Sequence, residues 1–151
     1  MRIFKSIDEM AAAVGQDLGV SDWLLVDQAR VNAFADATGD HHWMHVDVER
    51  AKRELPSKGT ITHGFLTLSL IPFLASKIFG CEGVSRELNY GVNKARFTNM
   101  VPTGARMRLS AKLAGTEKRA GGTLFTYEYR IEVEGEERPA CIAEVITILY
   151  P

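Results

Sequence analysis

Side chains that can take up and release protons are concentrated between residues 38 and 45, where the chain reads TGDHHWMH. Asp40 and His45 are five positions apart. On one continuous helix, at about 100° per residue, their side chains would point about 140° apart and could not converge. Across a turn that Gly39 permits, they can meet. A carboxylate and an imidazole that meet in a partly apolar site can act as a general acid–base pair.

A second candidate element is the start of an apolar helix at Thr62-His63-Gly64-Phe65. The first turn of a helix leaves backbone N–H donors free and carries partial positive charge. Gly64 has no side chain, so a ligand can approach its N–H closely. This combination can stabilise a developing oxyanion, such as a thioester enolate, and can polarise the thioester carbonyl.

A third candidate is the extended segment YGVNKARF, which runs from Tyr90 to Phe97. Lys94 and Arg96 alternate there with small or apolar residues, so their side chains project on one face of the segment. Two neighbouring cations on one face suit the phosphates of a ligand.

Each pattern also has a structural interpretation. The acid and the imidazole could simply stabilise a turn, the His-Gly dipeptide could be an ordinary helix start, and the two cations could form a solvated strand face. The histidines of TGDHHWMH are metal-ligand types, but no second cluster with ligand spacing accompanies them, so we predict no metal. The residues alone leave the function open between a lyase-type enzyme and a ligand-binding module.

The elements before these candidates are predicted to be helical. Ser6 and Glu9 form a capping box for a short helix that ends at Gly15. Asp27 caps a helix over residues 28–38, whose apolar positions recur at helical spacing and which Gly39 ends. A short charged helix over residues 47–55 stops at Pro56.

The second half of the chain combines one apolar helix with strands. Residues 65–79 are apolar on all sides, so this helix must be surrounded by other structure, and Pro72 should bend it. Strands are predicted over residues 84–90, 93–97, 106–114, 124–133 and 138–149, with turns at 121–122 and 134–136. This order predicts an α+β fold in which an antiparallel sheet curls around the helix.

Composition limits the classes of function. The 151 residues suit one domain over 1–151, with 46% apolar and 25% charged residues as in ordinary globular domains. A formal net charge of −1 gives no general attraction to nucleic acid or an anionic membrane. The two cysteines lack a metal or redox spacing, and neither a signal peptide nor a span of about 20 apolar residues is visible. We therefore expect a cytoplasmic protein with reduced thiols and no nucleic-acid or membrane partner.

Residues 34–47, FADATGDHHWMHVD, followed by Ala51, resemble the hydratase motif of the MaoC-like (R)-specific enoyl-CoA hydratases. That family places a catalytic Asp and His five residues apart, and its next element is a His-Gly start to a buried helix. The segment YGVNKARF and the VPTG turn at 101–104 resemble the strand that crosses this helix. His42-Trp43 stands where many members of the family have Asn-Pro. In this respect the sequence is similar to a subgroup that includes nodulation-protein-N-like sequences and 3-hydroxyacyl-thioester dehydratases.

The resemblance implies a hot-dog fold, with an antiparallel sheet wrapped around a long central helix, and a homodimer whose sheets join edge to edge. It implies reversible hydration of trans-2-enoyl-CoA to (R)-3-hydroxyacyl-CoA, with Asp40, His45 and Gly64 as catalytic residues. Substrate-binding candidates are His63, Tyr90, Gly91, Asn93, Lys94 and Arg96. No cofactor is needed, because CoA or an acyl carrier protein enters as part of the substrate. The alternatives are a hot-dog thioesterase and a non-catalytic acyl-thioester binding module.

Overall fold

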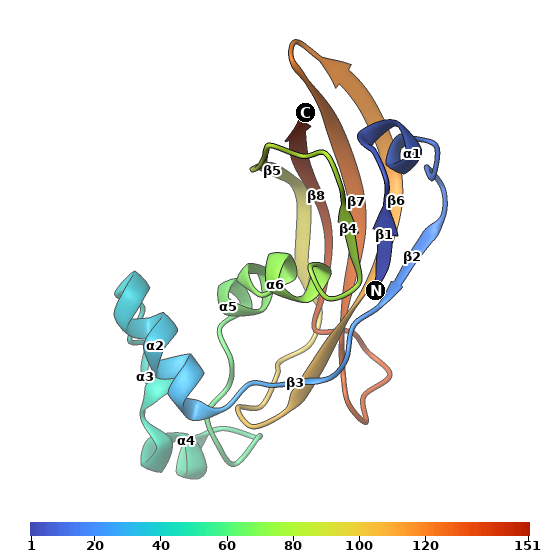
Figure 1. Cartoon of the computed structure of the whole chain (residues 1–151). Helices are drawn as coiled ribbons and strands as arrows, with labels where there is room; N and C mark the ends of the chain where they lie inside the picture. Colours follow the sequence, from blue (N-terminus) through green and yellow to red (C-terminus); the bar gives the residue numbers. More distant parts are fainter.

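A curved antiparallel sheet holds two short helices on its concave side, and a group of three further helices lies beyond one end of them (Figure 1). The computed structural model describes all residues, 1–151. Its helices are α1 (Ile7–Ala11), α2 (Gln28–Thr38), α3 (Trp43–Val46), α4 (Val48–Glu54), α5 (Gly64–Ser69) and α6 (Ile71–Ala75). Its strands are β1 (Arg2–Phe4), β2 (Asp17–Val20), β3 (Leu24–Leu25), β4 (Phe79–Cys81), β5 (Arg86–Phe97), β6 (Arg106–Arg119), β7 (Gly122–Val133) and β8 (Cys141–Tyr150).

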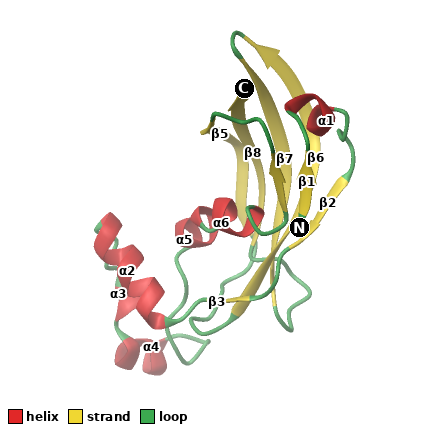
Figure 2. Ribbon diagram, viewed as in Figure 1, coloured by secondary structure: helices red, strands yellow, loops and turns green.

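The main sheet has the strand order β2-β6-β7-β8-β5, with β3 also paired to β6 (Figure 2). All of its pairs are antiparallel. The predicted alternation in β7 is confirmed, because its apolar residues from Phe125 to Val133 are buried while Glu128 and Arg130 are exposed. The predicted α+β fold, a hot-dog arrangement of sheet around helix, is therefore confirmed.

The central helix is shorter than predicted and is split into α5 and α6. The break lies at Leu70, two residues before Pro72, which has no backbone N–H to continue the helix. The helix ends at Ala75, and Phe79 belongs to β4. Surrounding structure does not cover it completely: Phe65 is 68% exposed and Phe73 is 47% exposed. The prediction of burial on all sides is thus wrong for a single chain.

Strand β5 forms one edge of the sheet and has an exposed apolar surface. Residues predicted as two separate pieces form one strand with register shifts between Asn89 and Gly91 and between Val92 and Lys94. Leu88, Tyr90, Val92 and Phe97 are all exposed along it. An apolar sheet edge of this kind is normally paired or covered.

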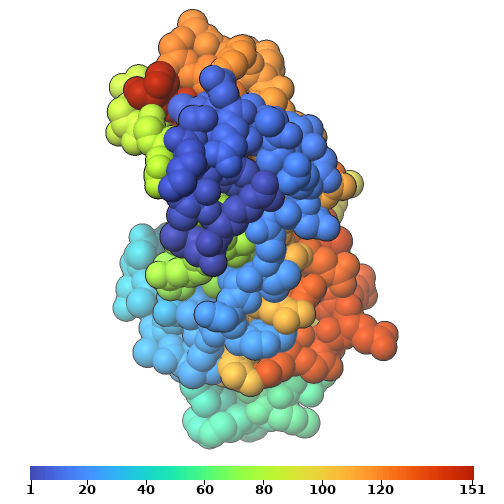
Figure 3. Space-filling model, turned by 45° about the vertical axis from the view of Figure 1, so that its right-hand side comes forward, coloured from blue at the N-terminus to red at the C-terminus, as the bar shows by residue number.

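The N-terminal segment, dark blue in Figure 3, lies on the upper part of the face of the molecule shown there. Its strand β1 pairs in parallel with β4, and these two strands form a small sheet of their own. Sequence reasoning missed both strands, since each has only three residues.

No helix in the structure has the length and apolar character needed to cross a membrane.

Candidate active site

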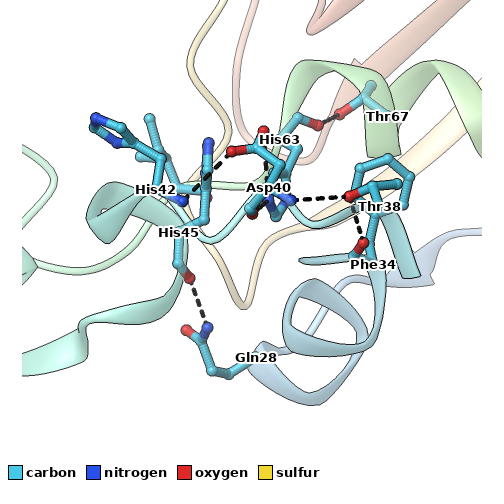
Figure 4. A network of polar contacts seen from close by, with 9 residues as sticks. Gln28, Phe34, Thr38, Asp40, His42, His45, His63 and Thr67 are labelled. Atoms are coloured by element: carbon cyan, nitrogen blue, oxygen red, sulfur yellow. Dashed lines mark hydrogen bonds and ion pairs between the residues drawn. The ribbon is translucent and has the colours of Figure 1, made fainter. Parts of the chain in front are cut away.

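The turn after α2 brings Asp40 and His45 together, as the sequence predicts (Figure 4). Asp27 caps the start of α2 by accepting a hydrogen bond from the Arg30 N–H, and Gly39 ends the helix in the left-handed region, with φ of 80°. Asp40 then lies in the loop and His45 in α3. One carboxylate oxygen of Asp40 and one ring nitrogen each of His45 and His63 all lie within 4.8 Å of one another.

The hydrogen bonds of His45 fix which ring nitrogen can act as a base. Its Nδ1 lies 2.7 Å from the carbonyl oxygen of Ile61, and a carbonyl can only accept, so Nδ1 carries the proton. Nε2 therefore presents a lone pair. Burial lowers the pKa of His45, and the hydrogen bond to Ile61 opposes this only in part. The ring is thus neutral and basic near pH 7.

His63 lies beneath the Asp40–His45 pair and is only 2% exposed. Its Nε2–H donates to the backbone oxygen of Asp40 at 3.0 Å, and its ring stacks on that of His45 with 3.7 Å between centroids. The ring of Phe34, which belongs to α2, packs against the His63 ring with 5.0 Å between the two centroids. His63 thus holds the backbone of one member of the pair and the ring of the other. Its predicted contact with substrate stays a prediction.

Gly64 begins α5, so its N–H has no acceptor within that helix. It lines a pocket of about 290 Å³ together with His45, and we call this space the site pocket. A Cβ at this position would lie 2.7 Å from the Phe97 ring, so only glycine fits against that ring. Gly64 therefore presents a backbone donor in the same pocket as the His45 ring.

Thr62 is a site residue that sequence reasoning left unused. Its side chain is buried, with 5% exposure, and it lines the site pocket. Its Oγ1 has no hydrogen-bond partner in the chain, which is uncommon for a buried hydroxyl. The sequence feature that could have identified Thr62 as a site residue is its position directly before the His63-Gly64 dipeptide.

The predicted carrier-binding residues lie on β5, apart from the Asp40–His45 pair. Asn93 donates to Glu144 at 2.5 Å, and Lys94 is in register with the same glutamate. Strand alternation puts Lys94 and Arg96 on the convex face of the sheet, opposite the face from which Phe97 reaches Gly64. Tyr90 is 62% exposed, next to the shift at Gly91. Within one chain these residues do not reach the site pocket, and their roles stay predictions.

The chain is similar to known proteins over most of its length. The model of the MaoC-like domain matches residues 9–135. The chain belongs to the MaoC-like dehydratase family. This MaoC-like protein is 48% identical over 147 residues to 3-hydroxyacyl-thioester dehydratase Z of Mycobacterium tuberculosis, covering 97% of each chain. It is 43% identical to nodulation protein N of Rhizobium leguminosarum, over 95% of this chain and 91% of that one.

Solved structures agree on the fold. The unliganded R-hydratase PhaJ1 from Pseudomonas aeruginosa superimposes with a TM-score of 0.72 at 22% identity, covering 91% of this chain and 81% of that one. The family resemblance predicted from residues 34–51 and from the His63-Gly64 dipeptide is thus confirmed. So is the subgroup, which contains the two relatives named above.

Proposed function

We propose that this MaoC-like protein adds water reversibly to a trans-2-enoyl thioester and produces the (R)-3-hydroxyacyl thioester. The observation that carries the proposal is that the Asp40 carboxylate lies within 4.8 Å of ring nitrogens of His45 and His63, while His45 and Gly64 line one pocket. The name of the relative that is 48% identical, 3-hydroxyacyl-thioester dehydratase Z, supports the same class of reaction. We propose one hot-dog domain over residues 1–151.

In this mechanism a water molecule is held between the Asp40 carboxylate and Nε2 of His45. Its oxygen forms a bond to C3 while the acid–base pair takes its proton. The electron pair of the double bond moves through C2 to the thioester oxygen, where the Gly64 N–H stabilises the enolate. The pair returns the proton to C2 on the same face, so one water has been added and the pair is restored.

The Thr62 hydroxyl is the remaining unpaired donor of the site pocket, and we assign it a hydrogen bond to substrate. A hydroxyl that has already lost its water contacts and has no protein partner gains a full hydrogen bond when substrate enters. Its contribution is to orient the substrate rather than to move a proton.

We also propose a homodimer formed through β5. The strand is an open sheet edge with exposed apolar side chains, and Phe65 of α5 and Phe73 of α6 expose further apolar surface. Lys94 and Arg96 make no ion pair with an acid within the chain, which suits a role in binding the phosphates of CoA or of a carrier protein. Sedimentation at several concentrations tests the dimer, and a monomer throughout would contradict it.

The reaction is tested by following the enone absorbance of crotonyl-CoA as water is added. Asp40→Ala and His45→Ala should each lower kcat by about 10²–10⁴-fold, the usual contribution of a positioned acid or base. His41→Ala is the matched control, because His41 is exposed and pairs with Asp36 at 2.8 Å, outside the site pocket. The proposal fails if the first two variants keep the wild-type rate.

Two further measurements separate the alternatives. A thioesterase would release free thiol from acyl-CoA, which a hydratase does not. A binding module would give a calorimetric signal without turnover. Chiral analysis of the product should give the (R) alcohol, and the (S) product would contradict the proposed geometry.

A further inference from the structure

The side chain of Gln28, the first residue of α2, is bonded to two other segments of the chain near the site pocket. Its Nε2 donates to the backbone oxygen of His45 at 2.7 Å (Figure 4), and its Oε1 accepts from the hydroxyl of Thr60. Nε2 also donates to Oδ1 of Asn32, one turn further along α2, at 2.9 Å. The NH2 group and the oxygen of the Gln28 amide therefore all have partners within the protein.

The chemistry of these partners determines how the Gln28 amide is oriented. The carbonyl oxygen of His45 can only accept a hydrogen bond, so the NH2 group must face it. The amide oxygen then faces Thr60, which is only 4% exposed and whose hydroxyl can donate. A side chain that lacked either the donor or the acceptor would leave one of these two groups without its partner.

Helix α3 needs such a contact from outside, because it is too short to be stable alone. It has only four residues, Trp43–Val46, and no side chain caps its start. The last four C=O groups of a helix have no donor within that helix, and the C=O of His45 is one of them. The hydrogen bond from Gln28 supplies a donor and so fixes the piece of backbone that carries the His45 ring.

The oxygen of the same amide fixes the segment that orients the ring. Nδ1 of His45 donates to the carbonyl of Ile61 at 2.7 Å, and Ile61 directly follows Thr60. The position of the ring therefore depends on how α3 lies relative to this segment. Gln28 is the only side chain from elsewhere in the chain that hydrogen-bonds both of them.

We infer that Gln28 is a positioning residue for the hydration reaction. By holding the backbone of His45 and the hydroxyl of Thr60 at once, it keeps the imidazole in the orientation in which Nε2 faces the reacting water. Gln28 does not line the site pocket, so its effect is transmitted through His45. The inference rests on the proposed hydratase function and adds a residue to it.

Two variants of Gln28 test the inference with crotonyl-CoA. Gln28→Met keeps the length of the side chain and removes both hydrogen bonds, whereas Gln28→Glu keeps an acceptor for Thr60 but has no N–H for the His45 carbonyl. Each should lower kcat roughly tenfold, less than the roughly 10²-fold that a 1 Å misplacement can cost. KM should change by less than about twofold, because the lost contacts are not made with substrate.

Variants of the partners separate positioning from a general effect on α2. Thr60→Val should lower kcat by roughly twofold to tenfold, the range for one net hydrogen bond, and Thr60→Ser should restore most of the loss. Asn32→Ala is the matched control, because it removes the third hydrogen bond of the same amide and leaves the bonds to His45 and Thr60 in place. Its kcat should equal that of wild type.

The ¹⁵N resonances of the His45 ring report its orientation without turnover. In the wild-type protein the neutral ring carries its proton on Nδ1, and a protonated ring nitrogen has a different ¹⁵N shift from an unprotonated one. In Gln28→Met the form protonated on Nε2 should also appear, because the ring is no longer held against the Ile61 carbonyl. His45→Ala identifies the resonances by their loss.

The outcomes separate the inference from the function on which it rests. Wild-type kcat in both Gln28 variants would overturn the inference, as would an equal loss in Asn32→Ala or a His45 ring that stays protonated only on Nδ1 in Gln28→Met. No turnover of crotonyl-CoA by the wild-type protein would overturn the proposed function, and the ¹⁵N comparison would still decide whether Gln28 orients the ring. If thermal unfolding shows that Gln28→Met does not fold, Gln28→Glu and the Thr60 variants decide.

Discussion

Replacing Gly64 with alanine should cost both stability and turnover, because the space for a methyl group is already occupied. The added Cβ would lie 2.7 Å from Cδ2, 2.8 Å from Cγ and 3.0 Å from Cε2 of Phe97. Cγ is the atom nearest the backbone of that ring, so a small rotation of the side chain cannot clear it. Either strand β5 or the start of α5 must move.

The size of the effect follows from this overlap. Overpacking of one methyl group costs about 1–3 kcal/mol of unfolding free energy. If the start of α5 moves, the Gly64 N–H leaves its place, and losing one oxyanion donor lowers kcat by about 10²–10³-fold. Urea unfolding and crotonyl-CoA hydration measure the two losses separately.

A double-mutant cycle with Phe97→Ala decides whether the ring is the cause. In the Phe97→Ala background the alanine at position 64 should cost less than 1 kcal/mol, because its methyl group then has room. Gly59→Ala is the control, since a Cβ there meets nothing within 4 Å. The reasoning is refuted if Gly64→Ala is as stable as wild type, or if its cost is unchanged when the ring is removed.

Three further predictions concern the Asp40–His45 pair and its surroundings. Since burial lowers the pKa of His45 and only its neutral form is a base, kcat/KM should fall with acid through a midpoint below 6.5; a midpoint above that value in a pH profile would contradict this. Thr62→Val should lower kcat/KM roughly tenfold, and Thr62→Ser should restore most of the lost kcat/KM. Thr103→Val is the control and should leave the steady-state kinetics unchanged. Equal rates for the Val and Ser variants at position 62 would refute the role of the hydroxyl. Gly39→Ala, at φ of 80°, should cost about 1–2 kcal/mol in thermal unfolding and lower kcat by displacing Asp40, and a fully active, equally stable variant would contradict the turn argument.

Local signals predicted the parts of the site that lie close together in sequence. Asp27 and Gly39 set both ends of α2, so the turn that lets Asp40 meet His45 could be predicted from residue types alone. The alternation in β7 likewise fixed which side chains face the helix. In each case the determining interactions are made by neighbours within a few residues.

Features that depend on distant contacts could not be predicted in this way. The hydrogen bond from His45 to Ile61 and the stacking of His63 on His45 join segments that only the fold brings together. The three-residue strands β1 and β4 stabilise each other across more than seventy residues and have no periodicity of their own. Exposure of Phe65 and Phe73 depends on what covers the helix, and the pattern of one chain does not contain that information.

Because Nδ1 of His45 is hydrogen-bonded to the Ile61 carbonyl, the imidazole can exchange protons only through Nε2. The Ile61 carbonyl behind the ring cannot accept a proton onward, so there is no relay to the protein surface from that side. A proton that the ring takes up at Nε2 must therefore leave from Nε2, on the side of the ring away from Ile61. Turnover should accordingly be insensitive to the concentration of added buffer, since a dissolved base has no rear approach from which to discharge the ring.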